Sequence, residues 1–356
     1  MEHLPTPVER IHLELTNHCN FSCEFCPDRI MTRPRGVMKE DLAKKALEEI
    51  AAQRLSKQVD LHIMGEPTLH PKLSEIISYG TGLGLRLSLT TNGSLLTSEL
   101  VDRLINAHLN ELIISVQTPD GDSFKKRYSK GITFEDYCIR IKEATHQIVK
   151  SNSSLQTIIT FRTTPFKRFL LPSTRISLID DNKTLRKILG HWLNFIAKDL
   201  MAPKEFEKAL KSINKLSVLK WNRFHLLPNL IFESRLLGDW AHSKIDKSDA
   251  CRAKFGFCHG LTENFGILWN GDFVFCCADF NGRTSIGQNI EDTKIVKWMA
   301  NPEVKKVASD FSRFRVTHPY CQICLGGPTW TYALAKTIGS IFYFKIYRRF
   351  KKEVTN

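Results

Sequence analysis

The sequence predicts an α/β fold in which parallel strands alternate with amphipathic helices. Residues 8–15 alternate apolar with polar side chains, which is typical of a strand, and residues 39–53 place their apolar side chains on one helical face. Strands and helices continue to alternate as far as Arg162. Because this alternation produces parallel βα units, and 356 residues can bury a substantial core, we expect one large α/β domain followed by a smaller one.

The other elements of the first half follow from the same patterns. Pro71 can begin the second helix, since proline suits the first helical turn, and Thr97 can cap the third. We expect strands at 60–64, 85–90, 111–116 and 155–162, and helices at 71–79, 97–107 and 134–150.

Chemically distinctive residues occur at or just after the ends of these strands. A cysteine-rich loop follows the first strand, residues 65–67 follow the second and residues 91–93 follow the third, while Ser115 and Arg162 lie in the fourth and fifth. Ligand sites of parallel α/β folds lie beyond the carboxyl ends of the strands. We therefore expect all of these residues to belong to a single site.

The cysteine-rich loop has the spacing C-x3-C-x2-C, formed by Cys19, Cys23 and Cys26. Three thiolates on a cubic iron–sulfur cluster leave one iron without a protein ligand, and an open iron can bind and activate another molecule. The alternatives are part of a zinc site or three buried thiols.

Residues 16–27 resemble the cluster loop of the radical S-adenosylmethionine (radical SAM) enzymes, and Phe25 matches the aromatic residue that precedes the third cysteine. The resemblance implies a partial (β/α)6 TIM-like barrel and a [4Fe-4S] cluster whose fourth iron is chelated by S-adenosylmethionine. In this family the cluster reduces the sulfonium, and the released 5′-deoxyadenosyl radical takes a hydrogen atom from the substrate.

Residues 64–67 resemble the Gly-Gly-Glu-Pro motif of the same family, which receives the amino group of the methionine moiety. Met64 replaces the first glycine, so only Gly65, Glu66 and Pro67 match. Glycine permits close approach of the backbone, and the Glu66 carboxylate can accept a hydrogen bond from an ammonium group.

Three further residues are candidates for contacts with S-adenosylmethionine. By their position, Asn92 and Ser115 suit the ribose or the carboxylate, although they could equally be a left-handed turn residue and an ordinary strand serine. Arg127 could meet the methionine carboxylate or be a solvated surface arginine.

Six cysteines lie in the last third of the chain. Cys258 is separated from Gly271 by twelve residues, and four more precede Cys276. Asn270-Gly271 predicts the turn of a β-hairpin, which would return Cys276 to the neighbourhood of Cys258. A helix expected at 292–310 would then bring Cys321 and Cys324 back to complete a four-cysteine site.

This arrangement resembles the SPASM/Twitch extension of radical SAM enzymes. The resemblance implies a second, auxiliary [4Fe-4S] cluster, in the shorter Twitch form because no cysteine follows the last pair. Cys251 or Cys277 could replace one of the four ligands, and a structural zinc site would also fit the spacing. The expected ligands are Cys258, Cys276, Cys321 and Cys324.

The rest of the chain supports a coarser division. We expect a radical SAM core at 1–165, the end of the barrel with a lid or substrate insert at 166–250, the auxiliary domain at 251–329, and a basic aromatic tail at 330–356. Within the second region, helices at 185–200 and 204–216 and a sixth strand within 221–232 are expected. The tail suits either a helix in a membrane interface or a helix packed on the barrel.

Composition narrows the partners and the compartment. A net charge of +14 favours anionic partners, and no nucleic-acid-binding signature is present, so no nucleic acid is expected. The first residues lack the apolar run of a signal peptide, and no stretch of about 20 apolar residues occurs. We therefore expect a cytoplasmic protein; peripheral contact at the inner face of the membrane is one of the two alternatives for the tail.

These features lead to an oxygen-sensitive radical SAM oxidoreductase that dehydrogenates a sugar-like or other small anionic metabolite. The auxiliary cluster would accept the electron, and a flavodoxin or ferredoxin would supply the reductant. Arg162 is the expected catalytic-site residue that faces the substrate, although arginine is a poor general base. The alternatives are a peptide-modifying radical SAM maturase and a non-catalytic iron–sulfur or zinc scaffold.

Overall fold

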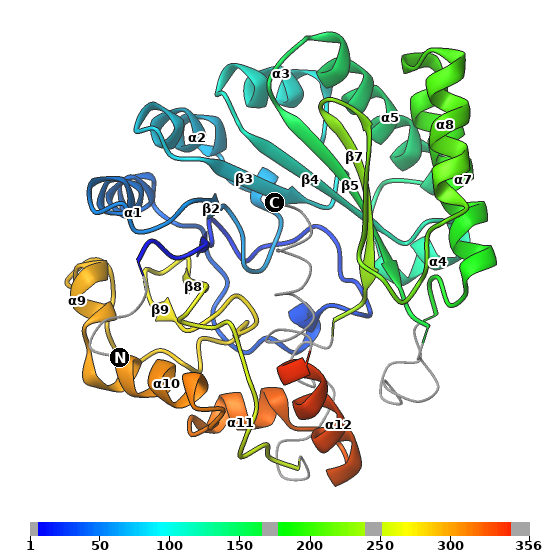
Figure 1. The fold of residues 1–356 in the computed structure, drawn as a ribbon. Coiled ribbons are helices and arrows are strands. Elements are labelled where there is room, and N and C mark those ends of the chain that lie inside the picture. Colours follow the sequence, from blue (N-terminus) through cyan, green and yellow to red (C-terminus); the bar gives the residue numbers. More distant parts are fainter. Residues whose placement is uncertain (1–5, 166–176, 239–250, 343–356) are drawn as a thin grey trace.

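The protein is described by a computed structural model that covers residues 6–165, 177–238 and 251–342. In these residues nine strands form one sheet in the order β6-β7-β5-β4-β3-β2-β1-β8-β9. The sheet is curved but remains open, because β6 and β9 form its two edges (Figure 1). The expected parallel α/β fold and partial barrel are confirmed.

The first five strands are parallel and neighbour one another in chain order. β2 is shorter than the strand expected at 60–64, because the chain leaves the sheet after Asp60 and leads into the turn at Gly65. These strands are β1 (Arg10–Leu13), β2 (Val59–Asp60), β3 (Leu87–Thr91), β4 (Glu111–Gln117) and β5 (Gln156–Thr163).

An antiparallel hairpin stands where the sequence predicts one sixth strand. β6 (Asn222–Leu227) pairs antiparallel with β7 (Leu230–Leu236), and β7 is the sixth parallel strand, beside β5. The prediction of a strand within 221–232 thus found the region but placed the parallel strand too early. At the other edge, β8 (Asn264–Ile267) runs parallel to β1, and β9 (Phe273–Val274) pairs antiparallel with β8.

Helices cover the outer face of the sheet. They begin where the sequence supplies a cap: the Thr97 side chain accepts a hydrogen bond from Leu100 N, and the Asp181 side chain accepts one from Thr184 N. Figure 1 shows these helices outside the curved sheet, where their apolar faces pack against its strands. They are α1 (Glu40–Ala52), α2 (Leu73–Gly82), α3 (Ser98–Asn106), α4 (Gly121–Phe124), α5 (Phe134–Lys150), α7 (Asn182–Ala197) and α8 (Pro203–Ile213).

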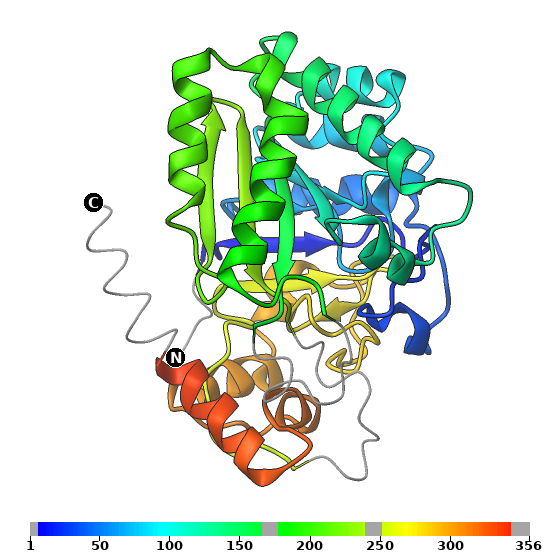
Figure 2. The same cartoon turned by 90° about the vertical axis from the view of Figure 1, so that its right-hand side faces the viewer.

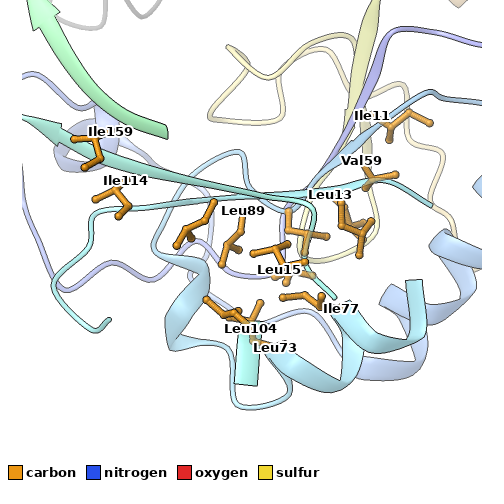
Figure 3. Close-up of a cluster of buried hydrophobic side chains, with 14 of the residues drawn as sticks. Ile11, Leu13, Leu15, Val59, Leu73, Ile77, Leu89, Leu104, Ile114 and Ile159 are labelled. Atoms are coloured by element: carbon orange, nitrogen blue, oxygen red, sulfur yellow. The ribbon is translucent and has the colours of Figure 1, made fainter. Parts of the chain in front are cut away.

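The main core lies between these helices and the outer face of the strands. Along each strand every second side chain points to it, including Ile11, Leu89, Ile114 and Ile159, all fully buried (Figure 3). The alternate side chains therefore point to the opposite, inner face. Many of those are polar or charged, although a parallel sheet buried on both faces is usually apolar throughout.

The C-terminal part forms a separate group of helices below β8 and β9 (Figures 1 and 2). The single helix expected at 292–310 is wrong: α9 ends at Met299, and α10 begins afresh at Pro302 with Asn301 as its cap. The group consists of α9 (Ile295–Met299), α10 (Pro302–Ser312), α11 (Pro319–Leu325) and α12 (Trp330–Ile341).

The tail is only partly described. α12 leaves Trp330, Ile338 and Phe342 exposed, whereas the basic cluster at 348–352 lies outside the described residues. Among the helices the structure describes, none combines the length and apolar character needed to cross a membrane.

Candidate functional site

The cysteine loop follows β1 and is closed at its base by side chains. Thr16 Oγ1 donates to Gly36 O over 2.8 Å. Asn17 donates to Pro34 O and accepts from Gly36 N, both over 2.8 Å. The two ends of the loop are thereby held side by side, which positions the three cysteines between them.

Cys19, Cys23 and Cys26 are partly buried neighbours within this loop. Burial raises the pKa of the Cys19 thiol to about 12, and it also raises the pKa of Cys26, to which Cys19 and Cys23 add. Thiols that raise one another's pKa in this way lie close together, and bound metal cations would offset the effect by favouring thiolates.

No single-ion site is formed by the side chains of the described residues, since no three His, Cys, Asp or Glu side chains converge closely enough to hold one metal ion. The fit of the loop to a [4Fe-4S] group rests on its donor set: three cysteine thiolates on a cubic cluster leave one iron open.

Residues 65–67, which follow β2, pack against the backbone of the cysteine loop. Glu66 N donates to His18 O over 2.7 Å. Gly65 has a φ of +78°, and a Cβ added there would lie 2.5 Å from Thr16 O and 2.7 Å from His18 O. Only glycine fits this approach, which explains why the Gly-Glu-Pro core is kept although Met64 replaces the preceding glycine.

The buried Glu66 carboxylate is already engaged within the protein. It accepts hydrogen bonds from Thr68 N and Oγ1, from Thr91 Oγ1 over 2.6 Å and from Asn92 N over 2.6 Å. Burial raises the pKa of Glu66, and these hydrogen bonds oppose that effect. The geometry therefore assigns Glu66 mainly to joining the Gly-Glu-Pro turn to β3, while Oε2, which accepts from Asn92 N alone among the described residues, keeps room for an ammonium group.

Asn92 lies beside the cysteine loop, and Ser115 lies on the inner face of the sheet. Asn92 Nδ2 donates to Asn20 Oδ1 over 2.8 Å and lies 4.0 Å from Cys19 Sγ. The left-handed residue of this turn is Gly93, with a φ of +85°, so the alternative of Asn92 as the left-handed turn residue is wrong. Ser115 is buried in β4, immediately before a bulge that precedes Gln117.

Arg127 lies beneath the cysteine loop rather than on the surface. Its guanidinium is fully buried, donates to Val116 O and to Tyr137 Oη, and stacks over the Phe21 ring at 4.7 Å. It also lies beside Cys23. Burial raises the pKa of the Cys23 thiol, and the positive charge of Arg127 opposes that rise. This position favours support of the cluster loop over the contact with the methionine carboxylate that the sequence suggested.

The thiols of the second cysteine set lie near one another, and their assignment as cluster ligands stays a prediction. Burial raises the pKa of Cys276, and the thiols of Cys258, Cys277, Cys324 and Cys321 are close enough to add to it. As in the first site, no three described side chains form a single-ion site, and the fit to an iron–sulfur cluster rests on the four cysteine donors.

The two spare cysteines differ in their surroundings. The backbone of Cys251 pairs with that of Gly327. Cys277 lies beside His12 of β1, and the pair raises the pKa of His12 despite its burial. Cys277 therefore connects the second cysteine set to the inner face of the sheet.

The inner face next to Cys277 carries an ionisable group that sequence reasoning missed. His12 Nδ1 lies 3.6 Å from Asp60 Oδ2, and Arg10 forms an ion pair with the same carboxylate over 2.9 Å. The ring of His62, just beyond β2, lies 6.3 Å from that of His12 in an edge arrangement. Burial lowers the pKa of His62 to about 4. The available signal was charged residues at alternate positions of strands that are otherwise apolar.

Arg162 lies on the same inner face, in β5, as expected of a group that faces a substrate. Burial and, less strongly, the nearby Arg235 lower the pKa of Arg162 to about 9, while Glu233 opposes them. The side chain of Arg162 makes no hydrogen bond or ion pair with any of the residues the structure describes. A desolvated guanidinium without a partner is a group ready to receive an anion or a hydroxyl.

The fold and the two cysteine sites define a class: a partial parallel barrel with a loop of three cysteines at one strand end and a second site of four cysteines in a C-terminal extension. Family models agree with it. The Radical SAM superfamily model matches residues 13–164, and an iron–sulfur cluster-binding domain, SPASM, matches residues 258–325. The chain belongs to the radical SAM superfamily and carries a SPASM/Twitch-type C-terminal domain.

Curated relatives match less than half of this chain. An AdoMet-dependent heme synthase of Methanosarcina barkeri is 36% identical over 111 residues, which is 31% of each chain. A probable GTP 3′,8-cyclase of Thermococcus kodakarensis is 31% identical over 146 residues, 40% of this chain and 45% of the relative. The matches therefore span between about a third and a half of those relatives.

Solved structures share the fold at low sequence identity. BtrN in complex with AdoMet and 2-DOIA has a TM-score of 0.51 at 14% identity and covers 86% of this chain and 88% of its own. SuiB of Streptococcus suis, bound to the precursor peptide SuiA, has a TM-score of 0.53 at 14% identity; the match covers 86% of this chain and 68% of SuiB. Membership of the superfamily and the SPASM domain make this chain an iron–sulfur enzyme with a [4Fe-4S] cluster that binds S-adenosylmethionine and an auxiliary cluster.

Proposed function

We propose that this enzyme oxidises a small, polar, anionic metabolite by removing two electrons and two protons, as in the dehydrogenation of an alcohol to a ketone. When bound, the two clusters and S-adenosylmethionine supply a radical that abstracts hydrogen and an acceptor for the remaining electron. We assign Cys19, Cys23 and Cys26 to the first cluster and Cys258, Cys276, Cys321 and Cys324 to the second.

The observation that carries this proposal is the position of the second cysteine set. Four thiols converge there, so a cluster held by all four has no open iron for a substrate and is suited to electron transfer. Cys277, next to the ligand Cys276, lies against His12 on the inner face. The acceptor site thus borders the face on which Arg162 and the histidines meet a substrate.

The chain's own residues account for the substrate's proton. Removal of hydrogen from an alcohol carbon leaves a hydroxyl whose proton must be taken by a base. Arg162 cannot act as that base while protonated, but it can orient the substrate. His62 is a neutral imidazole, and its buried Nδ1 has no hydrogen-bond partner in the described structure. We assign proton acceptance to His62 Nδ1, with the neighbouring His12 and Asp60 able to pass the proton on.

The partners follow from the same proposal. A substrate with an anionic group complements the inner face, and a small acidic electron carrier such as a flavodoxin or ferredoxin complements a chain of net charge +14. We place the reaction in the cytoplasm, with the exposed side chains of α12 available for peripheral contact with the inner face of the membrane.

The proposal is tested with the double variant Cys321→Ala/Cys324→Ala under anaerobic conditions. A panel of sugar phosphates, nucleotide sugars, hydroxycarboxylates and short peptides is screened with the wild type for stimulated formation of 5′-deoxyadenosine and for a product two mass units lighter. The variant should lose about four irons, keep formation of 5′-deoxyadenosine and lose the lighter product. Stimulation by peptides alone, or an oxidised product from the variant, would refute the proposal.

A further inference from the structure

Two arginines stand directly opposite each other on the inner face. In the parallel ladder between β5 and β7, Arg162 pairs in register with Arg235, and two residues earlier Thr160 pairs with Glu233. Phe161 and Phe232, on the opposite face of these strands, point into the buried core. The register therefore places both guanidinium groups on the inner face, where like charges in directly opposed positions destabilise a sheet.

The carboxylates nearby do not balance these charges. Arg235 Nε lies 3.6 Å from Glu233 Oε1, and Arg223 of β6, opposite Glu233 in register, lies 3.9 Å from Glu111 Oε2. Three guanidinium groups thus face two carboxylates in this part of the described sheet. The surplus falls on Arg162, which has no ion pair there; burial and the charge of Arg235 lower its pKa to about 9, and Glu233 offsets them only in part.

Other groups around the arginine pair are oriented to hold a polar ligand. Arg235 Nε is buried without a hydrogen-bond partner, and the guanidinium lies over the exposed ring of Trp221 at 5.7 Å. His62, whose Nδ1 is also buried and unpartnered, is near enough to Arg235 for the positive charge to lower its pKa further. These donors and the acceptor Nδ1 surround the same part of the inner face.

We propose that Arg162 and Arg235 form an oxyanion subsite that binds a carboxylate or phosphate group of the substrate. A bound oxyanion would relieve the repulsion between the opposed guanidinium groups and accept hydrogen bonds in the planar fork geometry that arginine provides. The subsite rests on the proposed function only in so far as its ligand is taken to be part of the substrate that is oxidised. It narrows that substrate to a hydroxylated small molecule with a carboxylate or phosphate group, which is held so that a hydroxyl can reach His62.

The subsite is tested without turnover, on the anaerobically reconstituted holoenzyme. Thermal unfolding is measured in potassium chloride and after replacement by potassium phosphate or potassium acetate at constant ionic strength. The variants are Arg162→Gln, Arg162→Lys and, as a matched control, Arg103→Gln, which removes an exposed arginine from α3. Isothermal titration with inorganic phosphate and with acetate supplies the dissociation constants.

In chloride, Arg162→Gln should raise the unfolding temperature, because it removes a half-buried charge that repels the opposed Arg235. Phosphate or acetate should stabilise the wild type and Arg103→Gln, but not Arg162→Gln, whose dissociation constant should rise about tenfold or more, with Arg162→Lys in between. A response to phosphate alone would indicate a phosphate ester, and a response to acetate alone a carboxylate.

The subsite would be overturned if Arg162→Gln lowered the unfolding temperature in chloride, or if all variants responded equally to the anions. Because no step of this measurement needs hydrogen abstraction or oxidation, its outcome is independent of the reaction proposed above. Loss of the oxidised product with an intact anion response would contradict the proposed reaction and leave the subsite standing.

Discussion

Replacement of Gly65 by alanine tests the contact between the Gly-Glu-Pro turn and the cysteine loop. Gly65 has a φ of +78°, and the new Cβ would lie 2.5 Å from Thr16 O, 2.7 Å from His18 O and 2.8 Å from Asn17 Cα. All three are backbone atoms, which cannot rotate away as a side chain can. The base of the cysteine loop must therefore move by several tenths of an ångström.

The cost has two parts. A left-handed conformation costs a non-glycine residue about 1–2 kcal/mol, and overpacking against fixed atoms typically costs about 1–3 kcal/mol. Gly84 separates them, since it has the same φ of +78° but a Cβ there would meet nothing within 4 Å. Gly84→Ala should therefore lower the free energy of unfolding by about 1–2 kcal/mol, and Gly65→Ala by about 2–5 kcal/mol.

The assay compares both variants with the wild type in anaerobic urea unfolding, iron retention against a chelator, and formation of 5′-deoxyadenosine. Gly65→Ala should release iron faster and form less 5′-deoxyadenosine, because the displaced backbone carries Cys19. Gly84→Ala should match the wild type in both respects. Equal losses of stability and of iron in the two variants would show that the turn does not press on the loop, and would refute the reasoning.

Two further predictions concern the second cysteine set and the inner face. Cys276→Ala should remove about four irons per chain, whereas the adjacent Cys277→Ala should keep them; equal iron in both variants would contradict the ligand assignment. For His62, the folded pKa of about 4 lies below the ordinary 6.5, so the unfolded chain binds the proton first. Stability should therefore be complete above pH 6.5 and fall by about 2 kcal/mol by pH 5, as measured by urea unfolding, and His62→Gln should flatten that decline. An unchanged slope in His62→Gln would show that His62 is not buried as a neutral ring.

Local patterns in the sequence were sufficient for much of the fold. The alternation at 8–15 and the cap at Thr97 gave β1 and the start of α3, because such features depend on neighbours in the chain. The helix expected at 292–310 failed at Pro302, which begins a new helix instead of continuing the old one. The assignment of the cysteines of both sites as cluster ligands stays a prediction, which rests on their short, specific spacings.

Features that depend on pairing between distant strands were not accessible from the sequence. The pairing of β8 with β1 brings Cys277 against His12, and the register of β5 with β7 brings Arg162 opposite Arg235. A shift of one residue in either ladder would turn these side chains to the other face. The burial of Arg127 beneath Phe21 was missed for the same reason, since its sequence neighbours are exposed lysines and a turn.

The most direct test of the account is the content of iron and sulfide per chain after anaerobic reconstitution, with 5′-deoxyadenosine assayed in the same sample after addition of reductant and S-adenosylmethionine. Two [4Fe-4S] clusters predict about eight irons and eight sulfides, together with 5′-deoxyadenosine. About four irons with 5′-deoxyadenosine would contradict the second cluster and with it the electron acceptor. Zinc without 5′-deoxyadenosine would contradict the radical enzyme altogether.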